Sequence, residues 1–235
     1  MLRMIRAFVA LVAAFAMTVL PVVPAMAAAY YVDDALGELA PDNKARVAEP
    51  KPVQLLFQFT TNGKANARAV KYLKPQILAL VQGSGLFSQV SETPVPGGAV
   101  LMITIDNIPE PGAAGKGFGA GLTFGLAGKI VHDDYVFTAE YVGGADAQPI
   151  KIQVPHRLYT QIGKHSPPPN ATRVKNIPAA VETITRQGVN HAINWVALDP
   201  GFGGVALVRP GPPPPLPAPG APPTPAAAPA PAAAQ

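Results

Sequence analysis

The sequence predicts an α+β domain over residues 52–208, in which an antiparallel or mixed sheet carries two helices packed on one face. Three observations support this class. Strand-type alternation opens the region, several further apolar runs of strand length follow, and two segments with helical periodicity stand near its ends. The order strand, helix, several strands, helix is typical of one sheet layer covered by helices. A length of about 155 residues is common for a single domain.

The first strand is expected where the domain begins. Val53, Leu55 and Phe57 alternate with Gln54 and Gln58 in this stretch. Side chains of a strand point alternately to its two faces, so this pattern indicates a strand with one buried face.

A helix is expected to follow from Lys64 to Val81. Its large apolar residues recur at helical spacing and form one buried stripe: Val70, Leu73, Ile77, Leu80 and Val81. Gly83 and Gly85 should end the helix, because glycine readily takes the conformation that follows a helix terminus. Pro75 should kink the helix or mark a start within it, because proline removes a backbone donor.

Four further strands and a second helix complete the expected domain. The strands are expected at residues 86–90, 100–105, 135–142 and 150–154, and the 100–105 run is apolar enough for a central strand. The second helix is expected from Pro178 to Ala197, since proline suits a first helical turn. Its buried stripe is expected to contain Val181, Ile184, Ile193 and Val196.

The start of the chain has the pattern of an export signal. Arg3 and Arg6 precede a short apolar run, and Ala25-Met26-Ala27 offers the small residues that a signal peptidase reads. The apolar run is shorter than the ~20 residues of a membrane-spanning helix. We therefore expect residues 1–27 to be a cleaved signal peptide, and the protein to be periplasmic or secreted.

Two other segments flank the domain. Residues 28–51 show little periodicity and are expected to form a loose leader. Residues 209–235 contain 12 prolines among 27 residues and almost no large apolar side chain, which predicts a disordered tail rich in proline and alanine. The chain has no cysteine, so the domain must be stabilised by its core rather than by disulfides.

The charge of the chain excludes one class of partner. Loss of Arg3 and Arg6 with the signal lowers the formal net charge from +4 to +2. The remaining basic residues are scattered along the chain, whereas a nucleic-acid surface needs them clustered on one face. We expect no nucleic-acid partner.

The glycine-rich segment 112–130 is the most unusual part of the sequence. Gly117, Gly119, Gly121 and Gly125 leave bare backbone against which another chain or a membrane surface can lie closely. A flexible hairpin or loop between two strands is the alternative. The 12 uncharged residues between Lys116 and Lys129 would span about 18 Å as a helix, which is too short for a bilayer core of ~30 Å.

Motifs for nucleotide, metal and catalytic chemistry are weak or missing. Gly115, Gly117 and Ala120 match a dinucleotide-binding spacing only formally, because no strand is expected before them, and no cofactor is expected. His132, Asp133 and Asp134 are the candidate metal ligands, since imidazole and carboxylate bind divalent cations. A polar turn leading into the next strand is the alternative for these three residues. No catalytic residue is assigned, because no serine stands in a nucleophile-elbow motif.

The order of elements resembles the small periplasmic domains of bacterial envelope-assembly proteins, namely the TolB amino-terminal domain and the LpoB type of lipoprotein. The segments that carry the resemblance are VQLLFQF, the helix from Lys64 to Val81, LFSQVSE and AVLMITIDNI. The resemblance implies a non-enzymatic protein that binds partners in the periplasm. The lipid-attachment cysteine of the lipoprotein members is missing here.

We therefore expect a non-enzymatic periplasmic binding or scaffold module that takes part in the assembly or maintenance of the bacterial cell envelope. Its expected partner is an envelope protein or a second copy of the chain. One alternative is an envelope hydrolase or a metal-dependent enzyme that uses His132, Asp133 and Asp134. The other is a protein that inserts into a membrane or self-associates through the glycine-rich segment.

Overall fold

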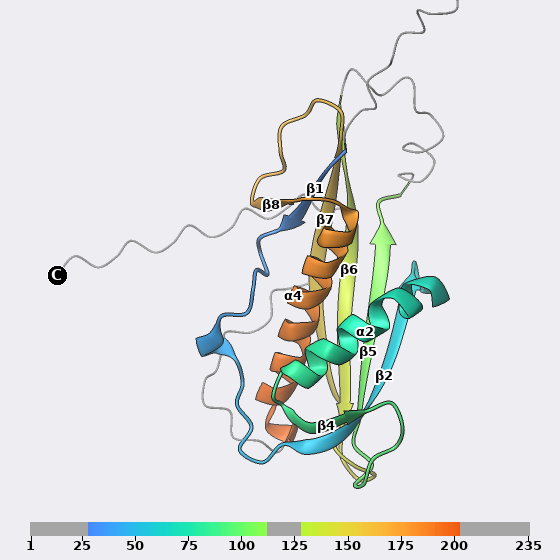
Figure 1. Ribbon diagram of the computed structural model, residues 1–235, viewed down its shortest axis with the longest axis vertical. Helices are drawn as coiled ribbons and strands as arrows, with labels where there is room; N and C mark the ends of the chain where they lie inside the picture. The colour runs from blue at the N-terminus through green and yellow to red at the C-terminus, as the bar shows by residue number, and fades with distance from the viewer. Residues whose placement is uncertain (1–27, 112–127, 203–235) are drawn as a thin grey trace, which may run out of the picture.

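The computed structural model describes residues 28–111 and 128–202 (Figure 1). Within these residues the chain forms an eight-stranded sheet, and helices α2 (Ala67–Gly83) and α4 (Ile177–Leu198) lie against one of its faces. The structure confirms the α+β class that the sequence predicts. The expected signal peptide and the expected tail lie outside the described residues.

The sheet is mixed, with the strand order β3-β2-β5-β6-β7-β1-β8 and with β4 beside β2. Strand β2 pairs in parallel with β4 and β5, and every other pair in the described sheet is antiparallel. A parallel neighbour needs a crossover connection, which α2 supplies between β2 and β4. The strands are β1 (Ala29–Asp33), β2 (Lys51–Thr61), β3 (Lys64–Ala65), β4 (Phe87–Ser91), β5 (Val100–Pro109), β6 (Lys129–Val142), β7 (Ile150–Ile162) and β8 (Ala171–Val174).

The first helix begins three residues later than the sequence predicts. Lys64 and Ala65 form β3, which folds back on β2 through a two-residue turn at Asn62 and Gly63. Both turn residues have positive φ, 50° and 71°, as the tightest hairpins require. Asn66 then caps α2 by accepting a hydrogen bond from the Ala69 backbone N–H at 3.1 Å.

Helix α2 otherwise follows the predicted pattern. Leu73, Ile77 and Val81 form its buried stripe. The helix runs through Pro75 rather than starting there. It ends at Gly83, and Gly85 just beyond has a φ of +72°.

Strands β6 and β7 are longer than predicted. The sequence predicts strands at residues 135–142 and 150–154, whereas the structure has 129–142 and 150–162. The added residues carry many polar side chains, so hydrophobic alternation does not reveal them. They are strands because they pair with each other in continuous register from Tyr141↔Ile150 to Lys129↔Ile162.

The segment predicted as a loose leader is an ordered part of the domain. Strand β1 pairs with β7 on one side and with β8 on the other, and its Tyr31 and Val32 are buried. A five-residue strand is too short for a clear sequence pattern. Pairing on both sides satisfies its backbone, so the neighbours and not the local sequence determine its conformation.

Polar contacts to α4 hold the rest of the leader. The Ala45 N–H donates to Asn194 Oδ1 at 2.6 Å, and Asn194 Nδ2 donates to the Asn43 carbonyl at 3.0 Å. Glu38 accepts hydrogen bonds from Arg186 NH2 at 2.8 Å and from Gln187 Nε2 at 3.0 Å. The leader is therefore attached to the same helix at two points.

Candidate functional site

The face of the sheet that carries no helix holds a row of polar side chains. Alternation along β6 determines which residues point there. Tyr135 and Phe137 belong to the buried core on the helix side. His132 and Asp134 occupy the alternate positions of the same strand, so their side chains point to the opposite, helix-free face.

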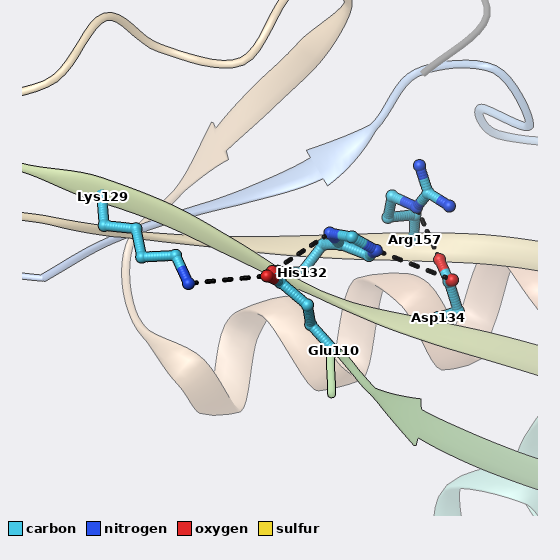
Figure 2. Close-up of polar contacts among 5 residues, drawn as sticks. All are labelled: Glu110, Lys129, His132, Asp134 and Arg157. Atoms are coloured by element: carbon cyan, nitrogen blue, oxygen red, sulfur yellow. Dashed lines mark hydrogen bonds and ion pairs between the residues drawn. The ribbon is translucent and has the colours of Figure 1, made fainter. Parts of the chain in front are cut away.

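Asp134 and Arg157 form the shortest ion pair of this row. They are direct partners in the β6–β7 register, and Arg157 Nε lies 2.5 Å from Asp134 Oδ1 (Figure 2). Only 6 % of the Arg157 side chain is exposed, against 20 % for Asp134. Burial by itself would lower the pKa of Arg157, but the hydrogen bond and the charge of Asp134 more than offset this, so the pKa is raised. The pair is held in a poorly solvated environment, where its charges interact strongly.

His132 lies between the carboxylates of Glu110, which follows β5, and Asp134, which lies in β6 (Figure 2). Its Nδ1 is 3.5 Å from Glu110 Oε2, and its Nε2 is 3.8 Å from Asp134 Oδ2. Glu110 also lies 3.5 Å from Lys129 Nζ, and its backbone N–H donates to the His132 carbonyl at 3.0 Å. The cluster of Glu110, Lys129, His132, Asp134 and Arg157 therefore links β6 to β7 and to the residue that follows β5; we call it the stem cluster.

The polar row continues from β7 to β1. The rings of His132 and Tyr159 lie 6.4 Å apart between centroids. The Tyr159 hydroxyl donates to Asp33 Oδ2 at 3.0 Å. Burial and the neighbouring Asp33 carboxylate raise the pKa of Tyr159 to about 12. This tyrosine therefore stays a hydrogen-bond donor throughout the physiological pH range.

The structure separates the three residues that the sequence suggests as metal ligands. They lie within β6 and not in a turn, so Asp133 points to the face opposite His132 and Asp134. Burial raises the pKa of Asp133 above its ordinary value of 3.8; the charge of His132 opposes this rise, and the charges of Asp134 and Glu110 add to it. Within the described residues, no three His, Asp or Glu side chains are grouped as a metal site would require. Strand geometry sends adjacent side chains apart, so the three candidate ligands do not lie together on one face of the sheet.

Sequence reasoning found His132 and Asp134 but missed Glu110, Lys129 and Arg157. The sequence alone does not reveal how neighbouring strands are aligned. Arg157 becomes the partner of Asp134 only through the register in which β6 and β7 pair. The other sequence-suggested residues, Gly117, Gly119, Gly121 and Gly125, lie outside the described residues. Glu110, two residues before the glycine-rich segment, and Lys129, near its end, both belong to the stem cluster.

Comparison with known proteins adds no relative. No protein-family model matches the chain, and no curated protein is significantly similar to it. Neither helix in residues 28–111 and 128–202 has the combination of length and hydropathy that crossing a membrane demands.

Proposed function

We propose that this protein is a non-enzymatic binding module of the bacterial cell envelope, and that it contacts its partner through the glycine-rich segment. The export pattern of residues 1–27 supports a periplasmic or secreted location. The resemblance in element order to small envelope-assembly domains supports a binding role.

One observation carries the proposal: the two ends of the glycine-rich segment are held side by side. Strands β5 and β6 remain paired up to Pro109↔Asp133, and beyond this the Glu110 N–H still donates to the His132 carbonyl. The ion pair between Glu110 and Lys129 then joins the two strands directly at the segment. A contact element that starts and ends on one fixed support loses less freedom on binding, which favours affinity.

The glycines themselves favour contact over mere flexibility. Glycine within a strand or helix lowers stability by roughly 0.5–1 kcal/mol relative to alanine, so core stability does not explain their number. Bare backbone at Gly117, Gly121 and Gly125 permits close approach of another backbone.

The test compares two triple variants in the native envelope. Gly117→Val, Gly121→Val and Gly125→Val together add bulk to the glycines. Ala113→Val, Ala114→Val and Ala120→Val add similar bulk to the same segment and serve as the matched control. Each variant is crosslinked in intact cells, its adducts are identified by mass spectrometry, and its melting temperature is measured on the purified protein.

We expect the glycine variant to lose its crosslinked adduct while its melting temperature changes by less than about 2 °C. The alanine variant should keep the adduct. Two differently tagged copies distinguish self-association from binding to another envelope protein. An adduct that persists in the well-folded glycine variant would overturn the contact role. Recovery of the chain with Met1 intact, in the cytoplasm or inner membrane, would overturn the envelope location, since cleavage after Ala27 should leave Ala28 as the first residue.

A further inference from the structure

A groove separates the amino-terminal halves of α2 and α4 above the sheet, on the face opposite the stem cluster. Its volume is about 400 Å³, within the range of small-molecule sites. Its floor includes Phe59 of β2, Asn107 of β5 and Tyr135 of β6. The groove is independent of the glycine-rich segment and of the function proposed above.

The floor presents polar groups that lack partners. Asn107 and Tyr135 are direct neighbours in the β5–β6 register. Tyr135 is only 8 % exposed, yet no group within the described residues forms a hydrogen bond with its hydroxyl or with the Asn107 side-chain amide. Neither group is enclosed in the core, so both are open to hydrogen bonding with a ligand that enters the groove.

The state of the Tyr135 hydroxyl limits what that ligand can be. Burial raises the pKa of Tyr135 well above its ordinary value of 10.0, and the nearby Asp133 carboxylate raises it further. The hydroxyl therefore remains protonated and can donate a hydrogen bond. The Asn107 amide can donate as well.

The walls of the groove are apolar and carry one charge. Tyr72 of α2 is 64 % exposed and Ile177 of α4 is 41 % exposed, which is unusual for side chains of this size. Both line the groove. Arg68, one helical turn before Tyr72, is the sole charged residue among the described lining residues, and it forms no ion pair with any described residue. A positive charge with no negative neighbour in the groove is complementary to an anion.

We propose that this groove binds a small amphipathic carboxylate of the fatty-acid class. Its carboxylate accepts hydrogen bonds from the Tyr135 hydroxyl and the Asn107 amide and pairs with Arg68. Its hydrocarbon chain packs against Tyr72, Ile177 and the neighbouring apolar wall. Three donors and no acidic residue among the lining residues favour a carboxylate over an amine; the Asp133 carboxylate is near Tyr135 but outside the lining.

In the test, dodecanoate is titrated into protein purified from cells that express the whole chain. Methyl NMR is the readout. The methyl groups of Leu73, Ile177 and Val181 report the groove. The Leu56 methyl groups report non-specific binding, because Leu56 is exposed on the helix-free face. We expect saturable shifts of the groove methyls at dodecanoate concentrations below about 1 mM, and no shift at Leu56.

Matched ligands and variants test each contact. Dodecanol, which has the same chain but no charge, should bind about tenfold more weakly. Tyr135→Phe removes only the hydroxyl, and Arg68→Gln removes only the charge; each should weaken dodecanoate binding about tenfold without unfolding the domain. Lys71→Gln makes the same charge change on an exposed part of α2 outside the groove and should leave binding unchanged.

Several outcomes would overturn the proposal. Groove methyls that do not shift would exclude a fatty-acid site. Equal binding of dodecanol and dodecanoate, or of the two groove variants and the wild type, would exclude recognition of the carboxylate. Shifts at Leu56 that parallel those at Val181 would identify non-specific adsorption.

Discussion

Gly188 of α4 lies directly against the ring of Phe137 in β6. A Cβ atom built on Gly188 would come within 2.3 Å of Phe137 Cδ2, a distance that real Cβ atoms do not reach. Phe137 is fully buried, so its ring cannot move into solvent. The missing side chain at Gly188 therefore lets α4 pack close against the sheet at this point.

Gly188→Ala should lower the free energy of unfolding by about 1–3 kcal/mol, because the added methyl group overpacks the core. This loss of stability is opposite in sign to the usual effect of the substitution, since alanine stabilises a helix interior by ~1 kcal/mol relative to glycine. Gly83→Ala on α2 is the control, because no atom lies within 4 Å of its added Cβ. Denaturant unfolding measures both variants, and a Gly188→Ala protein as stable as the wild type would show that the close contact is not maintained.

Asp134→Asn should lower the free energy of unfolding by about 3 kcal/mol, because it removes the charge that neutralises the buried Arg157 guanidinium. Glu92→Gln makes the same chemical change in an exposed ion pair, where Lys74 lies 2.9 Å away and both side chains are about half exposed. That control should cost less than about 1 kcal/mol. Equal losses in the two variants would mean that burial does not strengthen the pair in the stem cluster.

Stability should fall as the pH drops below about 6.5, because His156 is buried in its neutral form. Its Nε2 lies 2.7 Å from Gln187 Oε1 and its Nδ1 accepts a hydrogen bond from the Arg157 backbone N–H. Burial lowers the pKa of His156 from its ordinary value of 6.5 and outweighs the opposing effects of the Gln187 hydrogen bond and of Asp33 and Glu38. The unfolded chain therefore takes up the proton first, so stability is complete above the ordinary pKa and is lost as the pH falls.

Burial lowers the pKa of His191 as well, so it acts in the same direction. The slope cannot exceed about 1.4 kcal/mol per pH unit for each histidine. His156→Gln should remove one of the two contributions, which chemical denaturation at pH 7.5, 6.5 and 5.5 would reveal. Parallel pH profiles of variant and wild type would exclude His156 as a source.

Asn194→Ala should free the leader and lower the free energy of unfolding by about 2 kcal/mol, because the buried Ala45 N–H loses its acceptor. Hydrogen exchange at the Ala45 amide should accelerate in parallel. Asn190→Ala is the control on the same helix, since its side chain forms no hydrogen bond with the described residues. Unchanged exchange at Ala45 in the Asn194 variant would contradict the anchoring role.

The sequence predicts most of the core elements because their signals are local. The sequence predicts α4 from Pro178 to Ala197, and the helix spans Ile177–Leu198. The buried stripe of α2 and the run at 100–105 were likewise visible in the spacing of apolar residues. Each pattern depends only on residues within a few positions of one another.

The sequence indicates only part of the stem cluster. His132 and Asp134 are conspicuous as residue types, but their role depends on Glu110 and Arg157, which come from neighbouring strands. The same holds for the groove, where Arg68, Asn107 and Tyr135 come from a helix and two strands. No spacing along the chain indicates that such residues meet.

By itself, then, the sequence determined the α+β class and the buried faces of both helices, because periodicity encodes which side of an element is apolar. Tertiary structure alone decided three further features. It made β1 a strand, because pairing with β7 and β8 outweighs a weak local preference. It extended β6 and β7 through polar residues and thereby sent Asp133 away from His132. It aligned Asp134 with Arg157, and Asn107 with Tyr135, because the register between strands depends on contacts far apart in the chain.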